Sequence, residues 1–191
     1  MPRGLALSRT CDLTDFPACW TVAAWQQALA EYAWQQWTTE HHVRTREQSL
    51  CVNWSGVPFT APGPSALYQY RGEPGTTIER AVPAVYGLSV LDHADAPVRF
   101  LTRAAQILRP GGLLFLTFAI WDADGPDCAS GHTERARIYQ EDSWRKLVVE
   151  AKTAGFQTFG GMDWTYHGHK LGDDHSLASL VLTRRDGRRQ S

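Results

Sequence analysis

The pattern of hydrophobic and polar positions divides the chain into two unlike parts, with the change near residue 80. In the first part, residues 16–48 contain no glycine, and their only proline, Pro17, falls in what would be a first helical turn, where proline is tolerated. Apolar residues recur at steps of three and four, which predicts one helix with Asp15 as its N-cap. The predicted buried stripe consists of Val22, Trp25, Leu29, Tyr32 and Gln36.

Three tryptophans of this helix, Trp20, Trp34 and Trp37, lie off that stripe. Four of the chain's eight tryptophans fall within residues 20–37, and a single stripe cannot bury them all. Two interpretations stay open: the helix has a broad core face, or part of it is a docking surface for a protein partner or a second copy. Under the second interpretation, Trp20, Trp34 and Trp37 are the partner-binding residues.

The stretch 49–80 is broken by glycines and prolines, which leave room only for two short strands, 50–54 and 66–70. From residue 81 the pattern is regular and reads strand, helix, strand, helix, strand, strand: 84–91, 96–108, 113–120, 142–154, 157–166 and 177–184. This order predicts an α/β fold with a mostly parallel sheet, right-handed crossovers and an antiparallel C-terminal hairpin.

The ends and faces of the two later helices can also be predicted. Asp95 is placed to cap the first of them, and Gly155 to end the second in a left-handed conformation. The inward side of the first helix is predicted to carry Val98, Leu101, Ala105 and Leu108.

Length and charge narrow the class of protein. At 191 residues we expect a single domain, made of an N-terminal arm and helix (1–48), an irregular segment (49–80), a regular core (81–184) and a polar tail (185–191). The net charge of −1 gives no field that would attract nucleic acid or an anionic membrane. No apolar run approaches the roughly 20 residues that span a bilayer, and no signal peptide is evident. Four cysteines without a C-x-x-C pair favour buried or idle thiols.

The run YGLSVLDHADAPVRFLTRAAQILRPGGLLFLTF, residues 86–118, resembles the second half of class I S-adenosylmethionine-dependent methyltransferases. In that family an acidic-His pair such as Asp92-His93 ends the fourth strand, and a turn such as LRPGG at 108–112 leads into the fifth. The AGF at 154–156 and the closing hairpin also resemble the family, so the likeness covers about residues 81–184. It implies a reduced methyltransferase-like (Rossmann-like) α/β fold fronted by the tryptophan-rich helix.

The cofactor half of that family is not matched. The family's first strand runs into a glycine-rich loop, because backbone must approach the nucleoside closely, and an acidic residue after the second strand holds the ribose. Residues 1–80 contain no G-x-G; the nearest candidates for cofactor binding are Trp54, Gly56 and Glu73. Three prolines between the two short strands would break a crossover helix. The first crossovers are therefore expected to be loops, or this half is built differently.

Asp92 and His93 are the candidate catalytic residues, because ligands of α/β folds bind at the carboxyl ends of parallel strands. The resemblance implies that this pair could orient a methyl acceptor or accept its proton, and His93 is a suitable general base by residue type. The alternative is structural: Asp92 helps to hold the next helix and His93 packs against it.

Two loops mix metal-ligating residue types, but neither has a recognised zinc spacing, so we predict no metal site. The first contains Asp122, Asp124, Asp127, Cys128 and His132; the second contains His167, His169, Asp173, Asp174 and His175. The basic tail, with Arg184, Arg185, Arg188 and Arg189, is expected to be solvated.

Two functions from different classes remain. The first is a catalytically degenerate methyltransferase-like module that binds no cofactor and acts as a structural or assembly component. Because genes of this resemblance occur among the structural genes of tailed phages, a virion or similar particle made in the cytoplasm is the expected setting. The second is an active methyltransferase with an atypical S-adenosylmethionine site and an unknown acceptor.

Overall fold

In a computed structural model of the chain, the residues described are 22–41, 49–53, 59–60, 62, 68–70, 81–94, 96–121, 137–160, 169–170 and 175–186. The helices are α1 (Val22–Glu40), α2 (Val90–His93), α3 (Pro97–Ile107) and α4 (Glu141–Thr153). Within these ranges no helix has the length and apolar character needed to cross a membrane.

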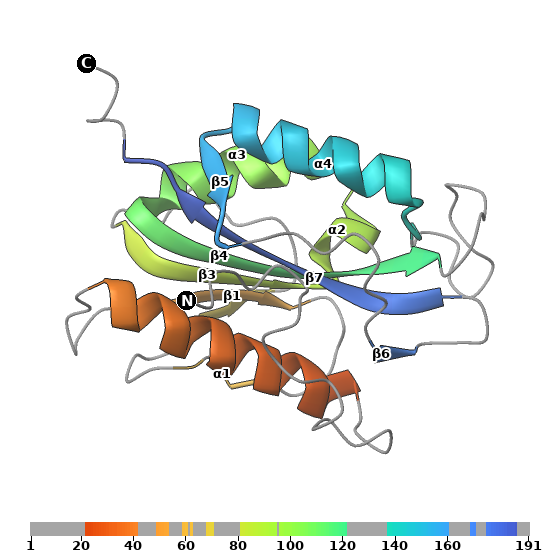
Figure 1. Ribbon diagram of the computed structural model, residues 1–191, viewed down its shortest axis with the longest axis horizontal. Coiled ribbons are helices and arrows are strands. Elements are labelled where there is room, and N and C mark those ends of the chain that lie inside the picture. The colour runs from red at the N-terminus through yellow and green to blue at the C-terminus, as the bar shows by residue number, and fades with distance from the viewer. Residues whose placement is uncertain are drawn as a thin grey trace.

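The strands form one mixed sheet: β1 (Leu50–Asn53), β2 (Tyr68–Tyr70), β3 (Val82–Leu88), β4 (Leu108–Trp121), β5 (Phe156–Thr158), β6 (His169–Lys170) and β7 (His175–Arg184). Their order is β2-β1-β3-β4-β7-β5, with β6 also paired to β7. β2, β1, β3 and β4 run parallel to one another, whereas β7 is antiparallel to β4, β5 and β6. The predicted α/β class, with its mostly parallel sheet and antiparallel C-terminal end, is confirmed (Figure 1).

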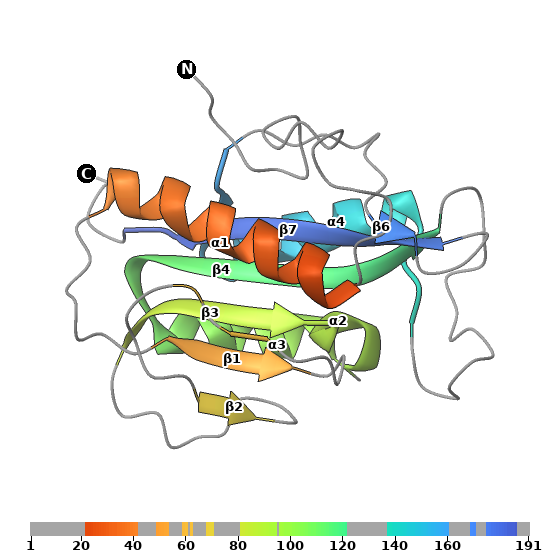
Figure 2. The ribbon, with the colours of Figure 1, turned by 90° about the horizontal axis from the view of Figure 1, so that it is seen from below.

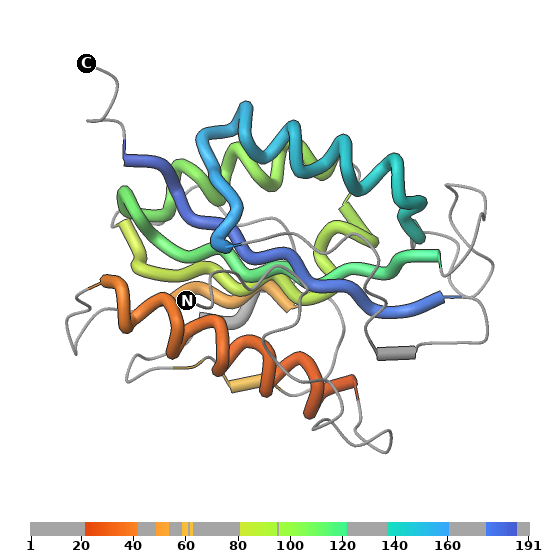
Figure 3. The backbone as a smooth tube through the Cα atoms, viewed as in Figure 1, coloured from red at the N-terminus to blue at the C-terminus, as the bar shows by residue number. Residues whose placement is uncertain are grey.

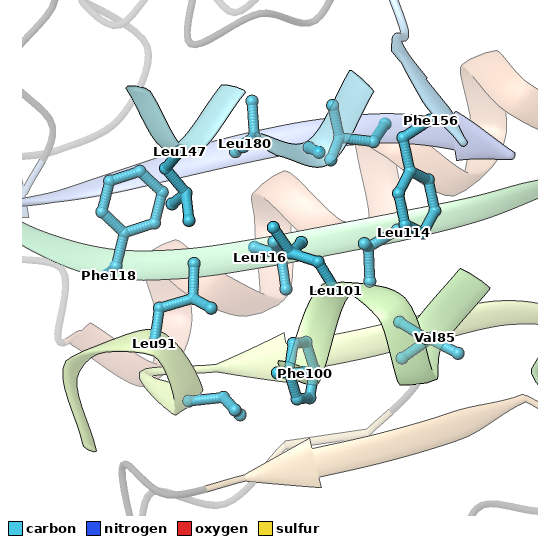
Figure 4. Close-up of a cluster of buried hydrophobic side chains, with 14 of the residues drawn as sticks. Val85, Leu91, Phe100, Leu101, Leu114, Leu116, Phe118, Leu147, Phe156 and Leu180 are labelled. Carbon is cyan, nitrogen blue, oxygen red and sulfur yellow. The ribbon is translucent and has the colours of Figure 1, made fainter. Parts of the chain in front are cut away.

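One face of the sheet is covered by α3 and α4, which lie side by side (Figures 1 and 3). Phe100 and Leu101 of α3 and Leu147 of α4 share a buried cluster with Leu116 of β4 and Leu180 of β7 (Figure 4). Each fully buried Leu or Phe side chain of this kind contributes roughly 1.5–3 kcal/mol relative to leaving it exposed. This face therefore holds the larger part of the hydrophobic core.

The opposite face is covered by α1, which crosses β4 and β7 when the sheet is seen from below (Figure 2). Its buried side chains pack on Tyr86 of β3, Phe115 of β4 and Val181 of β7. The buried set of α1 is Trp25, Gln26, Leu29, Ala30, Ala33, Trp34 and Trp37. Trp25 and Leu29 of the predicted stripe are buried, and Val22 and Tyr32 are partly buried and pack against the same cluster. The fully buried face continues through Ala33 and Trp37 instead of Gln36.

Two of the predicted partner-binding tryptophans are core residues. Trp34 is 8% exposed and Trp37 is 0% exposed, so the prediction that they form a docking surface is wrong. The indole Nε1 of Trp37 donates to the carbonyl of Gly111 at 2.9 Å, the guanidinium of Arg109 lies 5.6 Å from its ring centroid, and the His41 ring stacks on it at 5.2 Å. Three strands offer α1 a wide apolar surface, which is why one helix buries this many large rings.

The LRPGG turn forms a bulge at the start of β4. The four residues 109–112 lie opposite the single residue Pro83 of β3. Proline is tolerated at such a bulge because the ladder of hydrogen bonds between β3 and β4 is interrupted. Gly111 has φ +73°, a left-handed conformation that favours glycine. A Cβ on Gly112 would lie 2.8 Å from the carbonyl oxygen of Arg109 and 3.1 Å from that of Pro83. Gly111 is therefore favoured by its backbone conformation, and Gly112 by the lack of space for a side chain.

Several element predictions need correction. The strand expected at 84–91 ends at Leu88, because the chain turns into α2, and the strand expected at 157–166 is described only to Thr158. Val98 is 44% exposed instead of inward, since Phe100 and Ala104 take the buried positions of α3. Asp95 lies outside the described residues, and the N-cap position of α3 is Ala96. Gly155 has φ +97°, which confirms the predicted end of α4.

Replacing Trp37 tests its place in the core. Trp37→Phe removes the hydrogen bond to Gly111 and part of the ring packing, so we expect the free energy of unfolding to fall by about 1–3 kcal/mol. Val149→Ala, at a position that is 61% exposed on α4, is the control and should change it by less than about 0.5 kcal/mol. Urea unfolding measures both variants. Equal, small effects would show that Trp37 does not pack as described.

Candidate functional site

The candidate site lies at the carboxyl ends of β1, β3 and β4. β1 is flanked by β2 and β3, so the connection from β1 to β2 runs one way along the sheet and the connection from β2 to β3 runs back past β1. In open α/β sheets, ligands bind outside the carboxyl ends of the strands at such a switch point. Asn53, the last residue of β1, is nearly buried and pairs in register with Leu88, the last residue of β3.

Ser89 follows β3 directly and begins a turn that is held by buried polar groups. Its backbone is left-handed, with φ 52° and ψ 25°. Its N–H donates to the carbonyl oxygen of Thr117 at 3.0 Å and also to Thr117 Oγ1 at 3.2 Å. Gln26 Nε2, from α1, donates to the same Oγ1 at 3.0 Å. Gln26 is 1% exposed and Thr117 is 0% exposed, so the hydrogen bond between α1 and β4 is shielded from solvent.

Asp92 lies three residues further on, in α2, and is 6% exposed. Its Oδ1 accepts the backbone N–H of Ala119 at 2.8 Å, and the Ser89 side chain hydrogen-bonds to the same carboxyl group. Burial raises the pKa of Asp92 to about 7, although these two hydrogen bonds act in the opposite direction. The carboxyl group is therefore directed into the protein and is protonated in part near neutral pH.

The segment before α4 is tied to the same turn. The Arg137 N–H donates to the carbonyl oxygen of Asp92 at 2.6 Å, and the Tyr139 hydroxyl donates to that of Leu91 at 3.0 Å. Tyr139 also exchanges backbone hydrogen bonds with β4, through Ala119 and Trp121. Residues 137–140 thus close over the carboxyl end of β4.

Three aromatic or imidazole side chains near this end of the sheet are only partly buried. Burial lowers the pKa of His93, which favours its neutral form. Trp121, at the end of β4, and His175, at the start of β7, meet edge to face with ring centroids 6.0 Å apart. Of the two predicted catalytic residues, His93 is the one with solvent access.

Cys51 is a buried free thiol on the α1 side of the sheet. Burial raises the pKa of this thiol to about 12, so the thiolate that a nucleophile requires is scarce at neutral pH. The expectation of a buried, idle cysteine holds for this residue.

The structure describes only some of the other predicted site residues. The candidate cofactor residues Trp54, Gly56 and Glu73 lie outside the described residues, as does Trp20. The first metal-loop set is also outside them, and of the second set only the side chain of His175 is described. Among the residues that are described, no group of three or more His, Cys, Asp or Glu could hold a metal ion. Arg184 donates to the carbonyl of Leu108, so this basic residue has a structural partner.

Sequence reasoning missed Gln26, Ser89 and Thr117. Two signals were present. Thr117 is the only polar residue within the apolar run 113–120, and Ser89 and Asp92 have the S-x-x-D spacing of a capping box. The capping box is not formed: the Ser89 side chain makes no cap hydrogen bond, and the Asp92 carboxyl group accepts from the N–H of Ala119 in β4.

Comparison with solved structures identifies the fold. The [4+2]-cyclase SpnF superposes with a TM-score of 0.55 at 13% identity, covering 98% of this chain and 89% of that one. S-adenosylmethionine-dependent methyltransferases from Clostridium acetobutylicum and Mesorhizobium loti both match with TM-scores of 0.47 at 9% identity, covering 82% and 79% of this chain and 92% and 97% of theirs. No family profile and no curated protein matches the sequence.

The chain has a class I methyltransferase fold. The likeness of fold therefore extends beyond residues 86–118: β1 and β2 take parallel places beside β3 and continue the sheet on that side. At these levels of identity the comparison establishes the fold and not the reaction.

The raised pKa of Asp92 predicts a pH-dependent stability. Between the unfolded value of 3.8 and the folded value of about 7, the folded state binds more protons than the unfolded state, so the free energy of unfolding falls as pH rises through this window. Asp92→Asn can still accept from Ala119 and carries no charge. At about 1.4 kcal/mol per pKa unit, we expect this variant to gain up to about 4 kcal/mol on the natural protein between pH 4 and pH 8.

Urea unfolding at several pH values measures this difference. His93 has a lowered pKa and contributes the opposite slope, but it is present in both proteins and cancels in the difference. Asp142→Asn, at an exposed position of α4, is the matched control. A difference between Asp92→Asn and the natural protein that stays constant with pH would contradict the assignment.

Proposed function

We propose that the protein is a methyltransferase-fold module that does not use S-adenosylmethionine and serves as a structural or assembly component of a larger complex. The proposal is supported chiefly by the residues that follow β1, where the methyltransferase family that the sequence resembles has its glycine-rich nucleoside cradle. The name of SpnF, a [4+2]-cyclase, illustrates that methyl transfer does not follow from the fold.

The described residues after β1 are held against α1. Gln27 Nε2 donates to the carbonyl oxygen of Thr60 at 2.7 Å, and the Thr60 N–H donates to Gln27 Oε1 at 3.0 Å. Phe59 is buried, and its ring centroid lies 5.6 Å from that of Tyr86. The backbone N–H and C=O of Thr60 are therefore both hydrogen-bonded to a side chain of α1, and Phe59 packs against Tyr86 of the sheet.

The sequence around Thr60 prevents a crossover helix from forming there. In a helix the carbonyl of Thr60 would accept from the residue four positions on, which is Pro64 and has no N–H. Pro58 and Pro62 likewise lack the N–H groups that a helix N-terminus would direct at a ligand. With Gly56 as the only glycine in residues 54–62, these residues do not fit the cradle that the cofactor needs.

The Asp92 carboxyl group supports the same conclusion. Its carboxyl group hydrogen-bonds to two protein groups, the Ala119 N–H and the Ser89 side chain, and the side chain is nearly inaccessible to solvent. A general base must come within hydrogen-bond reach of the substrate proton that it takes. We therefore assign Asp92 to holding α2 against β4, which leaves His93, of the two candidate catalytic residues, to serve as a base in an active enzyme.

The assembly part of the proposal rests on the resemblance, which suggests a virion or similar particle. Trp34 and Trp37 give it no support, because both are buried between α1 and the sheet. If the chain docks on a partner or on itself, Trp20 is the remaining tryptophan of the predicted set.

The alternative is an active S-adenosylmethionine-dependent methyltransferase with an atypical cofactor site. The observation in its favour is the switch point itself, where Asn53 and the Ser89 turn lie at adjacent carboxyl ends of β1 and β3.

Calorimetric titration with S-adenosylmethionine separates the two functions. We expect no saturable heat up to millimolar ligand, because Pro58 and Pro62 have no N–H to donate and the N–H of Thr60 already donates to Gln27. A methyltransferase with an intact glycine-rich loop, titrated in parallel, is the positive control. Saturable binding near micromolar, about −8 kcal/mol, would overturn the proposal in favour of the active enzyme.

Light scattering of the purified chain tests the assembly role. We expect a mass above the 21.4 kDa of a monomer, and Trp20→Ala should reduce it if that residue lies in the contact. A strictly monomeric protein at all accessible concentrations would count against self-association.

A further inference from the structure

The polar contact between α1 and the carboxyl end of the sheet is unusual for a covering helix. Gln26 is buried on the same side of α1 as Trp25 and Leu29. Its side-chain amide nevertheless forms a hydrogen bond, to Thr117 of β4. Burying an amide without a partner costs at least about 1–3 kcal/mol, so this hydrogen bond ties the position of α1 to that of Thr117.

Thr117 in turn holds the Ser89 turn. A left-handed backbone at a residue other than glycine costs of order 1–3 kcal/mol and persists only where its surroundings enforce it. At Ser89 the enforcing groups are the carbonyl and hydroxyl oxygens of Thr117, both of which accept its N–H. The Ser89 side chain then contacts the Asp92 carboxyl group, which is anchored to Ala119.

We propose that Gln26 and Thr117 are positioning residues that couple α1 to the Ser89 turn, so that the docking of α1 and the placement of the Asp92 carboxyl group depend on each other. The coupling joins the two faces of the sheet at its carboxyl end: Gln26 belongs to the α1 layer, and Asp92 belongs to the cluster of α2 and β4. By reciprocity, a ligand or partner that moves the Ser89 turn also loosens α1. This inference does not depend on whether the fold binds a cofactor.

Among the residues that the structure describes, few other groups near Asp92 could produce the same effect. His93 lies on the same turn, and Arg137 and Tyr139 lie on the segment before α4. β4 contributes only the uncharged Thr117 and Ala119 to this network. A change at Gln26 or Thr117 therefore reaches Asp92 through Ser89 and not through a new charge.

Amide hydrogen exchange, measured by NMR, tests the first step of the coupling. Gln26→Met keeps the size of the side chain and removes the donor to Thr117, and Thr117→Val removes the shared hydroxyl. For both variants we expect the Ser89 amide to exchange roughly fivefold faster or more, relative to the Leu116 amide in the middle of β4. Thr117→Ser keeps the hydroxyl and should restore most of the protection. Gln35→Met, at an exposed position of α1, is the matched control and should leave the ratio unchanged.

The pH titration of the Ala119 amide shift tests the second step, because this N–H donates to the Asp92 carboxyl group. Loosening the turn admits water, so we expect the midpoint to fall in Gln26→Met and Thr117→Val and to stay near the natural value in Thr117→Ser and Gln35→Met. A purely structural role would lower global stability without moving either the Ser89 ratio or this midpoint, and that result would overturn the proposal. If Thr117→Val fails to fold, Gln26→Met carries the same test.

Discussion

The burial of β4 on both faces is the constraint on which the rest of this structure depends. β4 pairs with β3 on one side and with β7 along most of its length on the other, while α1 covers one face and α3 and α4 cover the opposite face. A strand enclosed in this way has no solvent to satisfy a polar side chain, so Thr117 must find its partners inside the protein. Gln26 and Ser89 are those partners, and through them one hydroxyl group determines how α1 and the turn after β3 are placed.

Much of the second half of the chain could be predicted, because its pattern is local. The continuous apolar run 113–120 marked the buried strand, and Gly155 marked the end of α4. The LRPGG motif was recognised from resemblance, and its two glycines have separate steric causes at Gly111 and Gly112. Periodicity was less informative for α1, since the width of its buried face is set by the three strands beneath it and not by the helix.

The candidate site was harder to predict because its contacts are long-range. Gln26 and Thr117 are 91 positions apart, and no local rule connects a glutamine in an amphipathic helix with a threonine in a distant strand. The sequence did show that Asp92 and His93 lie near the carboxyl ends of the strands, which the structure places at α2. It did not show that the Asp92 carboxyl group points inward, because that depends on the approach of Ala119.

A shifted pKa in a cleft is commonly taken as a mark of catalysis, and Asp92 shows why hydrogen-bond partners must be considered first. The same burial that raises the pKa of Asp92 to about 7 also keeps the carboxyl group from a substrate, and its hydrogen bonds connect β4 with the Ser89 turn. A carboxyl group used in this way can favour a neutral, hydrogen-bonded interior without taking part in any reaction. His93, next in the chain and half-buried, shows the opposite combination: more access to solvent and a pKa lowered by partial burial. If chemistry takes place at this end of the sheet, access and not the size of the pKa shift selects His93 as the residue that meets a ligand.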